Sequence, residues 1–145
     1  MSSIKAGVGR SDNAHSKKAG QEACQQAINQ LGQKPDVVMV FSSVSLDQEE
    51  MLQGVNEAAE GALVVGCSDS GEITTQGPTS KHVAVMALAS DQIKFTAGLG
   101  RNVGADSHRA GQEAAEEVAK KAPEKISLFI SMLEGLTGYG AALVR

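Results

Sequence analysis

A repeated segment constrains the fold of this chain more than any other feature. Residues 6–23 recur as residues 97–114 at a constant offset of 91 residues, and eleven of the eighteen aligned positions are identical. Identity this dense in a chain of 145 residues indicates a duplicated structural unit. We therefore expect one domain, residues 1–145, with copy one at about 4–91 and a copy two, incomplete at its C-terminal side, at about 92–145.

The apolar pattern of copy one predicts alternating strands and helices. The runs Asp36–Phe41 and Ala62–Val65 are continuous, as in parallel strands buried on both faces. The other elements expected in this copy are strands at 4–9, 82–89 and 92–99 and helices at 14–31 and about 48–60. Each unit thus follows the order β-α-β-α-β-loop-β-β, with strand 92–99 also opening copy two. This order predicts an α/β fold, a layered mixed sheet with helices packed on it.

Turn and cap residues set the expected boundaries of these elements. Asp12 or Asn13 is expected to cap the first helix, and Gly32 is expected to end it. Ser45 and Gln48 have capping-box spacing before the second helix, whose inward residues are expected to be Met51, Leu52, Val55 and Ala59. The short link Ser90-Asp91 favours an antiparallel hairpin. In copy two we expect a helix at about 106–122, a buried strand at 126–132 and a helix beginning near 137.

Composition limits the partners and the location that we expect. The net charge is −4 without a long run of either sign, which argues against a nucleic-acid partner. No apolar stretch approaches the roughly 18–20 residues of a membrane span, and the start of the chain has no signal-peptide pattern. Two distant cysteines do not form a disulfide framework. We expect a cytoplasmic chain with both thiols reduced.

The first candidate site follows the strand expected at 62–65. In open α/β sheets, ligands gather beyond the carboxyl ends of strands, where glycines also let the backbone approach a ligand closely. Thiol, hydroxyl and carboxylate groups occur together in this segment. The candidate ligand-binding residues are Gly66, Cys67, Ser68, Asp69, Ser70, Gly71 and Glu72. The alternative interpretation is a polar connection made of turn residues.

The second candidate is Arg10, with its repeat counterpart Arg101. Each follows a Gly-x-Gly at the end of an expected strand and precedes an expected helix. A guanidinium in that place can hold a carboxylate or phosphate through two parallel hydrogen bonds. The alternative is a structural ion pair, because a duplication also duplicates salt bridges. Neither copy has the third glycine of a dinucleotide-binding fingerprint.

The remaining reactive residues do not form a recognisable catalytic or metal-binding set. Cys67 is a possible nucleophile, but none of His15, His82 and His108 has a spacing that suggests a dyad with it. No close-spaced ligand pair indicates a metal site. Cys24 lies on the apolar stripe of the first helix and is expected in the core. We therefore predict no catalytic residues, no metal and no cofactor.

Four segments together resemble the FIST family, specifically its N-terminal domain. They are the opening Ala6–Ser11, the Ala- and Gly-containing helix that follows it, the run Pro35–Ser43, and Leu63–Ile73 with its Val-Gly-Cys-Ser-x-x-Gly-Glu-Ile pattern. The resemblance implies a sensory module of signal-transduction proteins that binds small ligands such as amino acids. It also implies signalling output domains as partners, and it places the ligand site on Gly66, Cys67, Ser68, Gly71 and Glu72.

These observations favour a non-enzymatic sensor that binds a small anionic or zwitterionic metabolite. Arg10 or Arg101 would hold its carboxylate, and the segment 66–72 would contact the rest. One alternative is an enzyme that uses Cys67 as its nucleophile. The other is an interaction module, because an unpaired sheet edge invites self-association.

Overall fold

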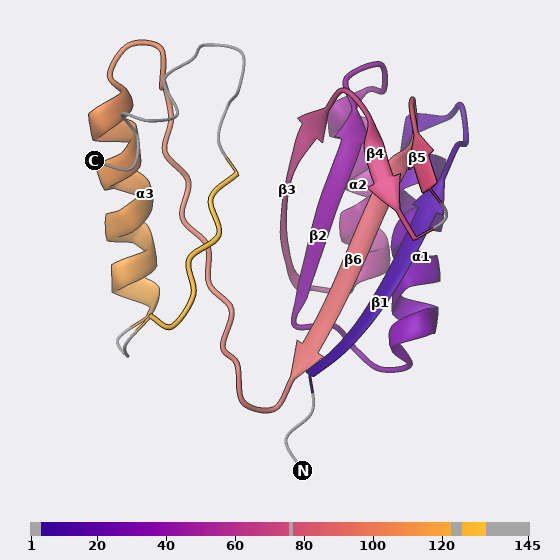
Figure 1. Cartoon of the computed structure of the whole chain (residues 1–145), viewed down its shortest axis with the longest axis horizontal. Coiled ribbons are helices and arrows are strands. Elements are labelled where there is room, and N and C mark those ends of the chain that lie inside the picture. The colour runs from indigo at the N-terminus through magenta and orange to yellow at the C-terminus, as the bar shows by residue number, and fades with distance from the viewer. Residues whose placement is uncertain (1–3, 76, 123–125, 133–145) are drawn as a thin grey trace. The chain divides into compact units, whose positions relative to one another are not determined.

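The computed structural model of the chain describes residues 4–75, 77–122 and 126–132. It consists of two compact units, Met1–Phe95 and Thr96–Arg145, here called unit one and unit two. Figure 1 shows the elements of both, and each unit is described by itself.

Unit one is a mixed sheet with two helices and a small hairpin. Its elements are β1 (Ile4–Ser11), α1 (Ser16–Leu31), β2 (Val37–Ser43), α2 (Gln48–Ala59), β3 (Leu63–Asp69), β4 (Glu72–Thr74), β5 (Gly77–Thr79) and β6 (Val83–Ser90). The main sheet has the order β1-β6-β2-β3, and β4 and β5 pair separately. Because β6 is antiparallel to β1 and β2, and β3 is parallel to β2, the C-terminal ends of β1, β2 and β3 all lie at the same end of the sheet. This confirms the predicted α/β class.

Helices α1 and α2 cover one face of the sheet (Figure 1). On β6, Val83, Val85 and the alanines that follow are buried in the helix-facing core, as strand alternation requires. The alternate residues form the other face, here called the open face. It consists of Ile4, Ala6, Val8, Arg10, Val37, Met39, Phe41, Ser43, Leu63, Val65, Cys67, Asp69, Ala84, Met86, Leu88 and Ser90. Among the described residues of unit one, no helix lies on it, but the β4–β5 hairpin packs against it near the start of β6.

One observed helix cap agrees with the prediction from the sequence, and two differ from it. Gly32 ends α1 with a left-handed φ of 73°, as predicted. The residue before α1 is His15, which makes no side-chain capping bond, so the expected cap from Asp12 or Asn13 is wrong. Asp47 caps α2 by accepting from the Glu50 amide at 3.0 Å, because Ser45 lies too far upstream of the helix start. The expected inward residue Leu52 is also wrong, since it is 40% exposed.

The expected hairpin between 82–89 and 92–99 is wrong. The first of these segments is β6, but residues 92–99 form no strand. Strand β6 already has β1 on one side and β2 on the other, so neither of its edges is free to accept a hairpin partner. The short link after Ser90 therefore leads out of the sheet.

Unit two contains α3 (Ser107–Lys121), within the helix predicted there, and Asp106 caps it by accepting from the Arg109 amide at 2.9 Å. The preceding extended segment packs along α3 through glycines. A methyl group on Gly98 would lie 2.1 Å from the Ala114 carbonyl oxygen, and one on Gly100 would lie 2.0 Å from that of Ala110.

Unit one has the same kind of contact between β1 and α1. Methyl groups on Gly7 and Gly9 would each lie 2.1 Å from a carbonyl oxygen, of Ala27 and Ala23 respectively. By the repeat offset, Gly100 corresponds to Gly9, but it faces the counterpart of Ala19 rather than of Ala23. The helix is thus displaced by four residues, one turn, in unit two. The contact recurs, while duplication of the whole unit remains a prediction.

The buried strand expected at 126–132 is also wrong. This segment is neither helix nor strand, and Leu128 and Phe129 are 77% and 62% exposed. Its counterpart β2 is buried between β6 and β3, and no counterpart of these two strands pairs with 126–132 in the described part of the chain. Without neighbours, an apolar run cannot form a central strand. The helix expected near 137 lies outside the described residues.

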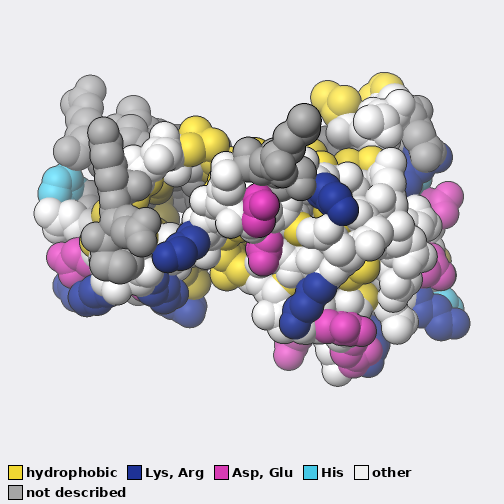
Figure 2. All heavy atoms as spheres, turned by 90° about the horizontal axis from the view of Figure 1, so that it is seen from below, with side chains coloured by type: hydrophobic (Ala, Val, Ile, Leu, Met, Phe, Trp, Pro, Cys, Tyr) yellow, Lys and Arg dark blue, Asp and Glu magenta, His cyan; other side chains and the backbone are white. Residues whose placement is uncertain are grey.

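The surface shown in Figure 2 carries Lys and Arg interspersed with Asp and Glu. Such mixing fits the small net charge of −4. In the described portions of the chain, no helix has the length and apolarity needed to cross a bilayer.

Replacing Gly20 by alanine tests the packing of α1 on α2. A methyl group there would lie 2.1 Å from the Met51 carbonyl oxygen. Helix propensity alone predicts that Gly20→Ala stabilises by up to about 1 kcal/mol, whereas the clash predicts a loss of about 1–3 kcal/mol. Urea denaturation measures the sign. Gln53→Ala, at an exposed position of α2, should change stability by less than about 0.5 kcal/mol, and a stabilised Gly20→Ala variant would contradict the packing.

Candidate functional site

The candidate segment 66–72 is mostly strand and not loop. Strand β3 pairs in parallel with β2 from Leu63 through to Asp69, so Gly66, Cys67, Ser68 and Asp69 belong to β3. The connection is only Ser70-Gly71, and Glu72 begins β4. The sequence placed the strand end too early because polar residues replace the apolar run while the backbone pairing continues.

Gly66 allows β3 to pair closely with β2. A methyl group on Gly66 would lie 2.0 Å from the Val40 carbonyl oxygen. Because side chains alternate along a strand, Cys67 and Asp69 share the open face, while Ser68 points to the opposite face. The candidate residues of β3 are thereby divided between the two faces of the sheet.

The strand register places Arg10 and Cys67 in one row across the open face. Arg10 pairs with Ala84, Ala84 with Phe41, and Phe41 with Cys67. Since β1 and β3 are the two edge strands, the backbones of Arg10 and Cys67 are three strand spacings apart, about 14 Å. Both predicted site elements therefore lie on one face and at one end of the sheet, but at opposite edges.

Arg10 is half-buried, and its charge has no partner among the described residues. Its backbone amide donates to Gln26 Oε1 at 3.3 Å. Within the described part of the chain, its guanidinium forms no ion pair and no hydrogen bond. A small hollow of about 40 Å³ beside it is bordered by Thr74 and Thr75, so the turn of the β4–β5 hairpin reaches the edge of β1. A free guanidinium at the carboxyl ends of strands is well placed to accept an anion.

Asp69 and Glu72 form a carboxyl pair at the end of β3. Glu72 is buried, at 2% exposure, and its Oε1 accepts from the His82 amide at 3.3 Å. Burial raises the pKa of Asp69 above its ordinary value, and the neighbouring Glu72 raises it further by its charge and by a side-chain hydrogen bond. Asp69 Oδ1 is buried without a hydrogen-bond partner among the described residues. A nearby cation would stabilise the charged forms of these two carboxyl groups.

The pKa of each of the two thiols is raised. Cys67 is exposed, but partial burial raises its pKa, and the charge of Asp69 raises it further. Burial raises the pKa of Cys24 to about 11, which agrees with its expected place in the core. In the described ranges, no three His, Cys, Asp or Glu side chains are grouped so that they could hold a metal ion.

Arg101 lies in unit two and not in the row that contains Arg10. Arg101 is exposed. The pKa of Glu117 is lowered mainly by the hydrogen bond that it accepts from Lys121, and the charge of Arg101 makes a small further contribution. Arg101 thus has an acidic residue near it, as the structural alternative predicts, although neither Arg101 nor Arg10 forms an ion pair among the described residues.

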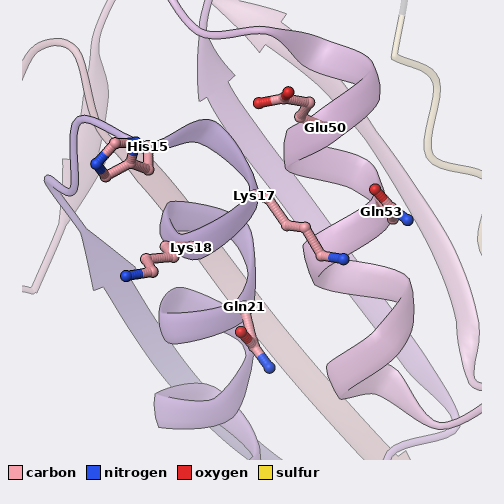
Figure 3. A pocket seen from close by; sticks show the side chains of 6 residues that line it. All are labelled: His15, Lys17, Lys18, Gln21, Glu50 and Gln53. Atoms are coloured by element: carbon pink, nitrogen blue, oxygen red, sulfur yellow. The ribbon is translucent and has the colours of Figure 1, made fainter.

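Sequence reasoning missed two features of unit one. One is the β4–β5 hairpin, which the β-branched run after Glu72 and the following Gly77 could have indicated. The other is an open cleft of about 440 Å³ between α1 and α2, lined by His15, Lys17, Lys18, Gln21, Glu50 and Gln53 (Figure 3). An ion pair crosses from α1 to α2 there, from Lys17 Nζ to Glu57 Oε1 at 2.7 Å. In the sequence, the two lysines in the first turn of α1, Lys17 and Lys18, could have drawn attention to this cleft, because cations are unfavourable at the start of a helix.

Replacing Asp69 by asparagine tests the carboxyl pair. Because the folded pKa of Asp69 is raised, the stability that this group contributes is full below its unfolded pKa and is lost as pH rises through the folded value. The melting temperature of Asp69→Asn should therefore rise relative to that of the wild type as the pH increases from about 4 to 7. The exposed Asp91→Asn serves as control. A difference between Asp69→Asn and wild type that stays constant with pH would contradict the pairing.

Comparison with solved structures finds partial likeness to FtsZ of M. jannaschii. A point mutant of that protein is 22% identical at a TM-score of 0.42, covering 64% of this chain and 30% of its own. An empty FtsZ dimer is 19% identical at a TM-score of 0.37, covering 64% and 32%. The chain thus spans about a third of the length of those proteins, and likeness at these scores carries no argument.

Comparison with protein families identifies the family of this chain. No curated protein matches it. The model of the FIST N domain, from a family of sensory signal-transduction domains, matches residues 36–145. The match includes the motif 63–73 and extends through both compact units. More than half of the chain is matched, and the chain therefore belongs to the FIST family.

Proposed function

We propose that this chain is a ligand-binding sensory domain whose ligand is a small anionic or zwitterionic metabolite, such as an amino acid. The ligand lies on the open face, at the end of the sheet where β1, β2 and β3 finish. One observation carries the proposal. The half-buried Arg10 guanidinium lies near this end of the sheet without a counter-ion among the described residues. Family membership supports the sensory role.

Arg10 supplies the anion-binding half of the site. A guanidinium binds a carboxylate through two parallel hydrogen bonds, and partial burial strengthens that interaction because less water competes for the charge. The residues between Arg10 and Cys67 in the row are Ala84 and Phe41, which give the ligand an apolar surface. Such a surface suits the carbon chain of an amino acid.

The end of β3 supplies the cation-binding half. Asp69 has a raised pKa because burial and Glu72 both disfavour its charge. An ammonium group beside it would favour the carboxylate form, so an amine would bind more tightly as the pH rises through the pKa of Asp69. Cys67, Ser70 and Gly71 border the same strand end, whereas Ser68 points away from it and Gly66 serves the pairing of β3 with β2.

A thermal-shift screen of single amino acids at millimolar concentration tests the proposal. A ligand that binds only the folded chain raises the melting temperature by mass action. Arg10→Gln should abolish the shift, corresponding to at least about a tenfold loss of affinity, since a charged hydrogen-bonding group is removed. Lys18→Gln, in the cleft between α1 and α2, should leave the shift unchanged. No shift with any amino acid, or a shift lost with Lys18→Gln and kept with Arg10→Gln, would contradict the proposed site.

The alternative function, an enzyme with a Cys67 nucleophile, has a weaker basis. Burial and Asp69 both raise the pKa of this thiol, which lowers the thiolate fraction at neutral pH. Cys67 should therefore react with a maleimide or iodoacetamide more slowly than a free thiol at pH 7. Asp69→Asn should speed the reaction, because it removes one of the two causes. Labelling of wild type faster than a free thiol would support the enzyme instead.

The proposed setting is a cytoplasmic signalling protein, with output domains as the partners that receive the ligand signal. This proposal rests on the family membership. It requires that ligand binding on the open face alter a surface that an output domain contacts.

A further inference from the structure

The extended segment that precedes α3 has one edge covered by that helix (Figure 1). The Leu99 amide donates to Glu117 Oε2 at 3.0 Å, and Lys121 Nζ donates to the Ala97 carbonyl oxygen at 3.0 Å. Both side chains come from α3. They occupy the backbone groups on this side of the segment, so no strand can pair there.

The opposite edge of the same segment has no partner in the described part of the chain. Backbone groups of successive residues in an extended chain point to alternate sides. Those of Gly98 and Gly100 therefore point away from the side that α3 covers. Among the described residues, none hydrogen-bonds to the backbone of either glycine. An edge of this kind is a template for pairing with another strand.

Strand β1 has the same two edges, and there the second one is occupied. The Val8 amide donates to Gln30 Oε1 of α1 at 2.6 Å, which covers one edge. Gly7 and Gly9, which alternate with Val8, pair antiparallel with β6 on the other edge. Unit one thus shows which kind of neighbour this arrangement accepts.

Unit two repeats the arrangement in sequence and in contacts. Residues 97–101 match residues 6–10 at every position but one. In both units a side chain of the following helix covers the central amide, and two glycines pack against that helix. The covering side chain Glu117 and the glycine contacts are displaced by the same four residues, one helical turn, relative to unit one. The counterpart of β6 is what unit two lacks among the described residues.

Helix α3 is also less covered than α1. The α1 residues Ala23 and Ala27 are fully buried, whereas in α3 only Ala110 is buried. Ala114 is the repeat counterpart of Ala23, and it is only half-buried. In unit one, side chains of β6 complete the core against α1. A strand beside Gly98 and Gly100 would cover α3 in the same way.

We propose that unit two binds an extended segment of a partner protein, which pairs antiparallel with residues 97–101 at the edge formed by Gly98 and Gly100. The segment has the chemistry of β6, which is rich in alanine and valine and carries no charge. Main-chain hydrogen bonds supply the affinity in this mode of recognition, and alternate side chains supply the specificity. The inference is independent of the proposed ligand, because its residues lie outside unit one.

Residues 126–132 offer the bound segment a second neighbour. In unit one, β6 lies between β1 and β2, and 126–132 is the counterpart of β2. Leu128, Phe129 and Ile130 are 77%, 62% and 61% exposed, so this apolar run is uncovered along consecutive residues. A strand with the pairing of β6 would bury part of this surface and thereby gain hydrophobic stabilisation.

A synthetic peptide with the sequence of residues 82–91 tests the proposal, with two lysines added at its end for solubility. In ¹H–¹⁵N spectra of the labelled chain, we expect this peptide to shift the Gly98 and Gly100 amides most, because they gain hydrogen bonds. Gly7 and Gly9 are the internal control. Their local sequence is nearly the same, but β6 already pairs with them, so their amides should stay unchanged.

Two control peptides separate strand pairing from unspecific apolar binding. One carries Val85→Pro and Ala87→Pro, which remove the two amides that face the glycine edge. It should bind at least about tenfold more weakly, since two hydrogen bonds are lost. The other has the same composition in scrambled order and should leave Gly98 and Gly100 unshifted.

Three results would overturn the proposal. The first is no shift of Gly98 and Gly100 with the peptide at millimolar concentration. The second is equal binding of the peptide and its proline variant. The third is a chain that is dimeric without peptide and in which both glycine amides are protected from hydrogen exchange, because a second copy would then occupy the edge.

Discussion

The close packing of α1 against β1 and α2 is the contact on which the rest of unit one depends. Gly7 and Gly9 let β1 approach α1, and Gly20 brings α1 to the backbone of Met51 on α2. Small side chains at these contacts place both helices on one face of the sheet. The other face carries the β4–β5 hairpin in place of a helix, and the proposed ligand site lies on it.

The sequence predicted elements whose signals are local and missed those that depend on pairing. Helices α1, α2 and α3 were predictable because the apolar stripe of each lies within one segment, although the start caps expected for α1 and α2 were wrong. Residues 92–99 and 126–132 have strand-like composition but form no strand. A strand exists only with a neighbour, and both sides of β6 are already occupied. Likewise, pairing with β2 extends β3 to Asp69, although the apolar run ends earlier.

The candidate site was predictable in its residues but not in its geometry. Arg10 and the segment around Cys67 could be singled out from their glycines and their place after strands. Their position in one row depends on the order β1-β6-β2-β3, which brings a late strand between two early ones. No local pattern encodes that order. The burial of Glu72, which limits the site to Asp69 among the carboxylates, was likewise not visible in the sequence.

Nuclear magnetic resonance tests the central claim, that the ligand binds on the open face at the strand ends, most directly. In ¹H–¹⁵N spectra of the labelled chain titrated with an amino acid, the account predicts the largest shifts at the Arg10 Nε–H group and at the Phe41 and Cys67 amides. Residues of the cleft between α1 and α2, such as Lys18 and Gln53, should stay unchanged. Shifts confined to that cleft, with the Arg10 signal unmoved, would contradict the account.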